Sequence, residues 1–227
     1  KSDLLIEGSY DEAMQGCGTV FHTASPFISN FKDPQRDLFD PAVNGTKNVL
    51  NAANRTESVT RVVLTSSCAA IYGDSADTTE APDGRIDESI WNTTSTLTHS
   101  PYSYSKRLAE QAAWKIADAQ DRWKMVVVNP ALIIGPSLGS KPTSDSFTLL
   151  IEFAKGSLKA GAPHLEFGAA DVRDIADAHL RAAFIEEANG RNIVFNKTIS
   201  VMDIANVLKS KWGSEYALPS RQMPKFL

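Results

Sequence analysis

The sequence predicts an α/β fold of the Rossmann type, a doubly wound parallel sheet followed by a smaller C-terminal region. Short apolar runs rich in β-branched residues alternate along the chain with longer stretches of helical periodicity. The runs lack the polar and apolar alternation of a half-exposed strand, so we expect helices on both faces of the sheet. Near Gly135 the composition changes to Gly, Ser and Pro, and the helical segments that follow are shorter.

The elements follow one another as a doubly wound sheet requires. Three runs are predicted to be buried parallel strands: residues 19–24 (TVFHTA), 61–66 (RVVLTS) and 124–129 (KMVVVN). Apolar residues at helical spacing fill the intervals at residues 34–55 and 101–119, and weaker helical patterns occur at residues 147–155, 174–187 and 200–211. The order strand, helix, strand, helix, strand implies right-handed crossovers. Residues 73–100 show no strong period, and a loop of that length is usually functional.

The chain is therefore divided into two parts. Residues 1–134 form the doubly wound domain, and residues 135–227 form the smaller region. Residues 171–187 are expected to pack back onto the first part.

The usual opening of a dinucleotide-binding sheet is missing. Such a sheet begins with a strand, a glycine-rich turn and a helix, because glycine lets the backbone approach a pyrophosphate. No G-x-x-G-x-x-G pattern occurs, and Gly16 and Gly18 precede a strand instead of following one. We expect that the first β-α-β region is absent, that residues 2–5 are the end of an earlier strand, and that the chain is incomplete at both ends.

Composition excludes several classes of function. The 227 residues are 42% hydrophobic and 22% charged, with a formal net charge of −4 and no cationic face suited to nucleic acid. No apolar run is long enough for a membrane span, and the first residues lack the apolar segment of a signal peptide, so a cytoplasmic protein is expected. The four histidines lack metal-ligand spacing, so no metal site is predicted.

Tyr102 and Lys106 form a Y-x-x-x-K motif inside a predicted helix, where a spacing of four places both side chains on one face. A phenol is a poor acid at neutral pH, and a nearby ammonium lowers its pKa. Taken alone the motif could equally be a helix surface pair. Ser66 and Ser67, however, end a predicted strand at the carboxyl edge of the sheet, where open α/β folds bind ligands. A serine hydroxyl there could bond to a carbonyl oxygen or simply cap a turn.

Six segments occur in an order that is specific to one protein family. They are TVFHTASP (residues 19–26), NGTKNVLNAA (44–53), RVVLTSS (61–67), YSYSKRLAEQAAW (102–114), NPALIIGP (129–136) and DVRDIADAH (171–179). Together they resemble the dihydroflavonol reductase and cinnamoyl-CoA reductase branch of the extended short-chain dehydrogenase/reductase family. The resemblance covers nearly the whole chain and implies a Rossmann domain with a substrate-binding region at residues 135–227.

The resemblance also implies roles for individual residues. Ser67, Tyr102 and Lys106 correspond to the catalytic serine, the proton donor and the lysine that binds the ribose. Asn44 resembles the helix asparagine that helps to hold a proton-relay water. The positions that correspond to cofactor contacts are Asp3 and Leu4 beside the adenine, Thr23, Ala24 and Ser25 under the adenosine, Lys106 at the ribose, Pro130 to Ile133 at the nicotinamide amide, and Ser146 near the pyrophosphate.

The implied reaction is reduction of a ketone or aldehyde to an alcohol with NADP(H), with NAD(H) as the alternative cofactor. The implied partner is a small carbonyl substrate, and the sequence leaves monomer and dimer open. Two departures bear on the substrate. Cinnamoyl-CoA reductases carry N-W-Y-C-Y-G-K where this chain has S-P-Y-S-Y-S-K, and Tyr72 stands where dihydroflavonol reductases have an asparagine that contacts the flavonoid.

Two other functions stay open from the sequence. A nucleotide-sugar epimerase or dehydratase shares the serine, tyrosine and lysine, and SSCAAIYGD (residues 66–74) resembles that branch, whereas NPALIIGP and RLAEQAAW resemble the reductases. The second alternative is a catalytically inactive fragment. Because no glycine turn is present, we expect the 227-residue chain itself to bind NADP(H) weakly and to show no useful activity.

Overall fold

The computed structural model describes residues 1–25, 31–139, 144–213 and 215–224. They form two compact units: the first consists of Lys1–Pro130 and Ile175–Val194, and the second of Ala131–Asp174 and Phe195–Leu227. The chain therefore passes between the units three times.

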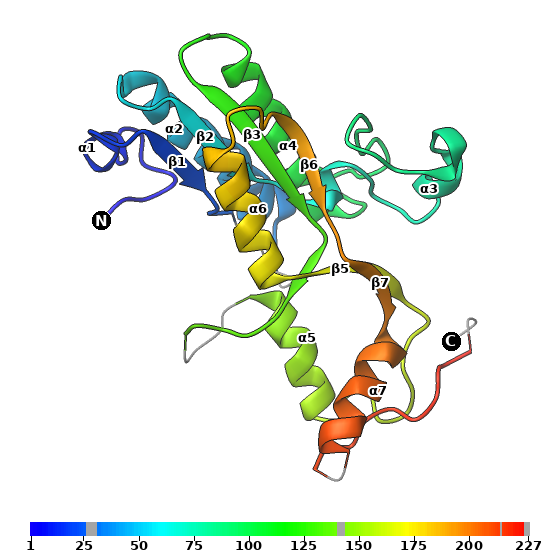
Figure 1. Ribbon diagram of the computed structural model, residues 1–227. Helices are drawn as coiled ribbons and strands as arrows, with labels where there is room; N and C mark the ends of the chain where they lie inside the picture. Colours follow the sequence, from blue (N-terminus) through cyan, green and yellow to red (C-terminus); the bar gives the residue numbers. More distant parts are fainter. Residues whose placement is uncertain (26–30, 140–143, 214, 225–227) are drawn as a thin grey trace. The chain divides into compact units, whose positions relative to one another are not determined.

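The first unit contains a four-stranded parallel sheet in the order β1-β2-β3-β6 (Figure 1). Its strands are β1 (Thr19–His22), β2 (Arg61–Thr65), β3 (Lys124–Pro130) and β6 (Gly190–Val194). Every neighbouring pair is parallel, so all four carboxyl ends lie at the same edge. The predicted fold class and the three strands predicted from apolar runs are confirmed.

Helices cover both faces of this sheet (Figure 1). On one face lie α2 (Asp40–Arg55), which follows the π-helical turn η1 (Gln35–Phe39), and α4 (Pro101–Ala117). The other face is covered by α6 (Val172–Phe184). Side chains of β2 alternate between these layers: Val62 and Leu64 belong to the core with α2 and α4, whereas Val63 packs with α6.

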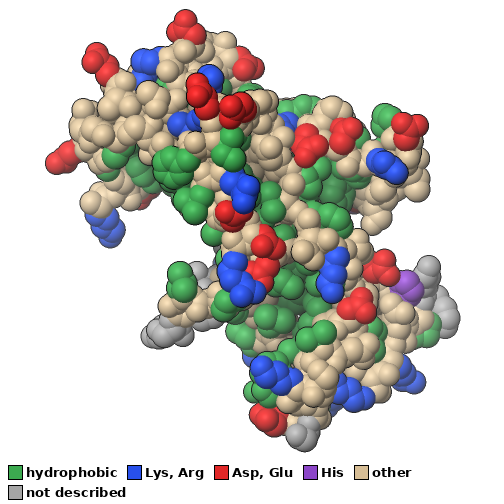
Figure 2. All heavy atoms as spheres, in the orientation of Figure 1, with side chains coloured by type: hydrophobic (Ala, Val, Ile, Leu, Met, Phe, Trp, Pro, Cys, Tyr) green, Lys and Arg blue, Asp and Glu red, His purple; other side chains and the backbone are tan. Residues whose placement is uncertain are grey.

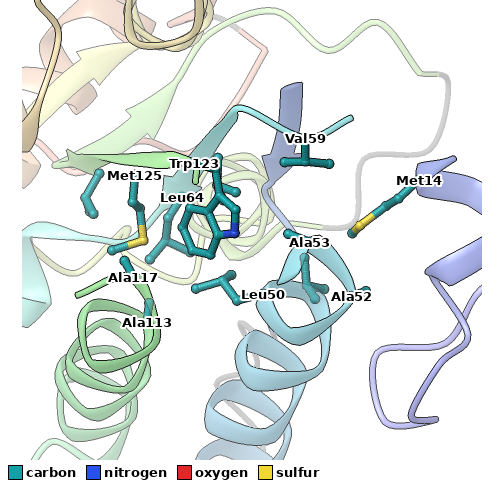
Figure 3. Packing of buried hydrophobic residues seen from close by; sticks show 13 residues of the cluster. Met14, Leu50, Ala52, Ala53, Val59, Leu64, Ala113, Ala117, Trp123 and Met125 are labelled. Atoms are coloured by element: carbon teal, nitrogen blue, oxygen red, sulfur yellow. The ribbon is translucent and has the colours of Figure 1, made fainter. Parts of the chain in front are cut away.

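The main core lies between the sheet and the pair α2 and α4 (Figure 3). Leu50 of α2 and Ala113 of α4 are completely buried there, beside Trp123, which leads into β3. Trp123 Nε1 donates to Asn54 Oδ1 at 2.8 Å, which satisfies the indole N–H. Burial of each large side chain contributes about 1.5–3 kcal/mol, so this core fixes both helices on the sheet.

The second unit has a three-stranded sheet in the order β4-β5-β7, formed by β4 (Leu132–Ile134), β5 (Glu166–Asp171) and β7 (Lys197–Ser200). Two helices accompany it, α5 (Asp145–Ala154) and α7 (Val201–Trp212), with Phe153 completely buried among them. Ser200 begins α7 in a capping box with Asp203. This sheet was not predicted. Gly168 makes β5 look like a loop, but a Cβ there would lie 3.0 Å from Phe195 Cδ2, a tight contact that glycine avoids.

One predicted strand is wrong. Residues 2 and 3 have no regular structure and residues 4 and 5 form a turn, where local polar bonds satisfy part of the backbone. Asp3 Oδ1 accepts from Leu5 N at 2.8 Å, and Ser9 Oγ donates to Asp3 O at 2.6 Å. The short helix α1 (Asp11–Met14) follows.

The predicted loop at residues 73–100 contains only two short helices, α3 (Asp77–Glu80) and η3 (Pro82–Gly84).

Acidic and basic side chains are interspersed on the face shown in Figure 2. Within the described part of the chain, every helix is too short or too polar to cross a membrane.

Candidate active site

The candidate site lies in the first unit, where β2 ends. Ser66 and Ser67 follow this strand directly, and Ser67 begins the short helix η2 (Cys68–Ala70). Ser67 Oγ accepts from Ala69 N at 3.1 Å, so the hydroxyl caps the turn and keeps its own proton available to donate. The turn thereby fixes Ser67 at the carboxyl edge of the sheet.

Tyr102 and Lys106 lie in the first turns of α4. Pro101 takes the first helical position, and the preceding Ser100 has a left-handed conformation with φ 51° that turns the chain into the helix. Ser105 Oγ donates to Tyr102 O at 2.7 Å. Tyr102 is half-buried and Lys106 is buried, one helical turn apart on the same face.

The ammonium of Lys106 reaches the end of β2. Its Nζ donates to Thr65 O at 3.4 Å. Burial lowers the pKa of Lys106 from 10.5 to about 8, while the charge of Glu110 acts in the opposite direction. Lys106 is therefore mostly protonated at neutral pH, and its positive charge lies on the same helix face as Tyr102.

A second contact holds α4 at the same place. Ser66 Oγ donates to Glu110 Oε2 at 2.5 Å, and α4 packs on η2. The structure thus brings Ser67, Tyr102 and Lys106 to the same end of β2, from two segments that are far apart in the sequence. Their catalytic roles remain predictions.

The proposed cofactor positions of the first unit fall into two groups. Thr23 and Ala24 are exposed and Ser25 is half-buried directly after β1, and Pro130 ends β3. These residues share the carboxyl edge of the sheet with Ser67, because the strands are parallel.

Asp3 and Leu4 lie in the turn before α1, where Asn48 Nδ2 of α2 donates to Leu4 O at 3.0 Å. Asp3 is exposed and Leu4 is half-buried.

Three further predicted residues lie on other elements. Asn44 is on the exposed side of α2, whose buried polar side chains are Thr46 and Asn48. Ile133, in β4, and Ser146, in α5, belong to the second unit.

Sequence reasoning missed His22, a buried residue at the end of β1. His22 Nε2 is hydrogen-bonded to Thr46 Oγ1 at 3.3 Å. Burial, and then the charge of Lys106, lower the pKa of His22 to about 4, so its ring is neutral at physiological pH. A histidine within an otherwise apolar strand was the available signal.

Glu110 was also missed. Its carboxylate is completely buried and accepts from Arg191 Nε of β6 at 2.6 Å and from Asn129 Nδ2 of β3 at 2.9 Å. Glu110 stands four residues after Lys106, so it lies on the same helix face. This spacing could have indicated that Glu110 is close to the candidate site.

Comparison with known proteins supports the resemblance to extended short-chain dehydrogenases/reductases that the sequence motifs indicate. Residues 1–196 match the model of the NAD dependent epimerase/dehydratase family. A cinnamoyl-CoA reductase of Medicago truncatula is 37% identical over 99% of this chain and 66% of its own length, and a tetraketide alpha-pyrone reductase of Arabidopsis thaliana is 35% identical over the same shares. The chain therefore spans slightly less than two thirds of the length of these relatives.

A solved structure gives the same picture. The methylglyoxal/isovaleraldehyde reductase Gre2 of yeast, crystallised with NADPH, has a TM-score of 0.82 and 29% identity, covering 97% of this chain and 70% of that one. The predicted resemblance is confirmed, and the chain belongs to the NAD dependent epimerase/dehydratase family.

Proposed function

We propose that the protein reduces a ketone or aldehyde to an alcohol with NADPH. The observation that carries this proposal is the buried Lys106, held one turn after Tyr102 and beside the end of β2 at Ser67. Relatives at 35–37% identity are named as reductases, and the yeast reductase was crystallised with NADPH.

Each residue has a distinct task in this proposal. Tyr102 gives its proton to the oxygen of the reacting carbonyl as negative charge develops there, and Ser67 donates a second hydrogen bond to the same oxygen. Lys106 stabilises the phenolate that remains on Tyr102. Solvent then returns the proton to Tyr102.

The residues present fit a nicotinamide cofactor. An ammonium carries three N–H donors, and Thr65 O accepts one from Lys106, so others are available for ribose hydroxyls. Pro130 and the segment after β1 lie at the same carboxyl edge, where a dinucleotide binds in open α/β folds. When bound, the cofactor supplies the hydride.

Tyr72 is a candidate substrate-contacting residue. Tyr72 follows η2 and is half-buried, and burial raises the pKa of its phenol, so it remains a neutral hydrogen-bond donor. We propose a carbonyl compound with an aromatic group as the first substrate class to test.

The test is oxidation of NADPH by the protein expressed from its complete reading frame, followed at the nicotinamide absorbance band. The panel comprises aromatic aldehydes, ketones and dihydroflavonols, and NADH replaces NADPH in a parallel series. Loss of absorbance with a carbonyl compound is the expected result. Conversion of a nucleotide sugar without net cofactor oxidation, together with no reaction of any carbonyl, would replace the proposal by the epimerase alternative.

A further inference from the structure

Glu110 is the most deeply buried charged side chain of the first unit that the proposed reaction does not use. Its side chain is completely buried, and that of its partner Arg191 is 8% exposed. Arg191 Nη1 also donates to Glu88 O at 2.9 Å, and its guanidinium lies 3.8 Å from the centre of the Trp91 ring. Burial of two charged side chains costs desolvation free energy, so stability alone does not explain the ion pair of Glu110 and Arg191.

The carboxylate of Glu110 joins α4 to residues of three neighbouring strands or their immediate ends. Oε2 accepts from Ser66, directly after β2, and from Asn129 of β3. Oε1 accepts from Arg191 of β6 and, at 3.3 Å, from Trp114 Nε1 of α4. Asn129 Nδ2 donates in addition to Ser67 O at 3.2 Å. This carboxylate therefore adds polar contacts that hold α4 beside Ser67, on top of the packing of α4 on α2 and η2.

The same carboxylate acts on Lys106, one turn earlier on α4. Burial favours the neutral amine, and Glu110 opposes that effect. His22 on β1 is close enough for the charge of Lys106 to lower its pKa, Tyr102 lies one turn earlier on α4, and His179 of α6 bonds to the Thr65 hydroxyl through Nε2 at 2.6 Å. His22 has a pKa of about 4 and is neutral near pH 7, so among these neighbours Glu110 supplies the negative charge.

We propose that Glu110 is a positioning residue of the active site, which holds α4 on the strand ends and provides the counter-charge for the Lys106 ammonium. The kinetic part of this proposal rests on the proposed reductase function. The titration of Lys106 does not, because it can be measured without turnover.

The main experiment is an NMR titration of the lysine side chains in the wild type and in Glu110→Gln, with Lys106→Met identifying the signal. Glutamine can still accept a bond through its oxygen but lacks the charge, so Lys106 should lose its proton roughly one pH unit lower than in the wild type. Ser66→Ala is the matched control, because it removes one bond to Oε2 and leaves the charge in place. Lys106 in this control should titrate as in the wild type.

If Lys106 has the same pKa in the wild type and in Glu110→Gln, the proposal is wrong. It is also wrong if Glu110→Gln and Ser66→Ala lower the pKa of Lys106 equally. If Glu110→Gln does not fold, Glu110→Asp replaces it. The shorter side chain withdraws the charge, so Lys106 should again titrate below the wild type, and an unchanged titration would again contradict the proposal.

The kinetic experiment uses the protein expressed from its complete reading frame. At pH 7.5, Glu110→Gln should lower kcat about threefold with a smaller effect on KM, because a pKa near 8 that falls by roughly one unit leaves about a third as much protonated Lys106. Activity should recover near pH 6, where Lys106 regains its proton. A loss that is equal at both pH values would indicate a purely structural role. If the wild type shows no carbonyl reduction but the titration result holds, the proposed function fails and the role of Glu110 stands.

Discussion

Lys106 is buried although its proposed role requires a charge, and this conflict has a measurable effect on stability. The pKa of Lys106 is about 8 in the folded protein and 10.5 ordinarily. Burial of the charged lysine therefore lowers the free energy of unfolding. This destabilisation is fully present below pH 8 and disappears as the pH rises from 8 to 10.5, because the folded state loses the proton first. We expect Lys106→Met to raise the free energy of unfolding at pH 7 by up to about 3 kcal/mol, while activity is lost.

Urea denaturation at pH 7 and at pH 9.5 checks this prediction, because the advantage of the variant should shrink at the higher pH. Lys115→Met is the control. Lys115 lies on the same helix but is exposed, so its replacement should change stability little at either pH. A destabilised Lys106→Met at pH 7 would contradict the prediction.

Tyr102 is tested by replacement with phenylalanine. This change removes the proposed proton donor and keeps the ring, so kcat for carbonyl reduction should fall about 100- to 10,000-fold while NADPH binding stays nearly unchanged. Tyr104→Phe is the matched control. Tyr104 stacks on Phe39 at 5.9 Å between ring centres and lies under the Arg107 guanidinium, contacts that a phenylalanine ring retains. Steady-state kinetics and calorimetric titration with NADPH distinguish the outcomes, and more than half the wild-type rate in Tyr102→Phe would show that the assignment is wrong.

The sequence predicts those site residues that a local pattern connects, and it misses those that are brought together only by the folded chain. Tyr102 and Lys106 are linked by helical periodicity, and Ser67 by the end of an apolar strand, so local patterns are sufficient. Arg191 is 81 residues from Glu110, and no local pattern indicates that the two form a buried pair. Asn44 was assigned from the family resemblance and not from a local pattern; it is exposed on α2, and its role stays a prediction.

Among the secondary-structure elements, β6 is joined to α4 by the ion pair of Arg191 and Glu110. Arg191→Met would leave a buried carboxylate without its cation, so we expect a loss of roughly 3–5 kcal/mol in the free energy of unfolding. Arg181→Met is the control, because the pair of Arg181 and Asp177 is 66% and 58% exposed, and its loss should change stability by less than about 0.5 kcal/mol. Urea denaturation of the two variants gives the comparison, and similar midpoints would contradict the expected difference.

The predictability of the elements follows their burial. β2 and β3 are buried on both faces and have continuous apolar runs, and α2 and α4 have clear apolar stripes, so the sequence predicts all four within a few residues. The strand β5 contains Gly168 and Glu166 and pairs with β7 through a contact that only the folded chain provides. Its sequence resembles a loop, and the sheet of the second unit is therefore absent from the prediction.

For the whole molecule, cofactor choice is the property to measure. A ligand that binds only the folded state stabilises it by about 2.7 kcal/mol at a concentration 100 times its Kd. We expect NADPH to raise the Tm of the protein, expressed from its complete reading frame, in a concentration-dependent manner and more than NADH does. Thermal denaturation with each cofactor over the same concentration series checks this, and a larger effect of NADH would reverse the assignment.

The three passages of the chain between the two units have a consequence for the order in which the protein is made. The last strand of the first unit, β6, pairs with β3, and Val126 lies opposite Gly190. Between them the ribosome synthesises residues 131–189, of which 131–174 belong to the second unit. Translation proceeds at roughly 5–20 residues per second, so the edge of β3 and the carboxylate of Glu110 remain unpaired for several seconds before β6 and Arg191 are synthesised. A nascent chain exposes this unpaired edge throughout that interval, and an unpaired strand edge is a site at which chaperone binding or aggregation begins.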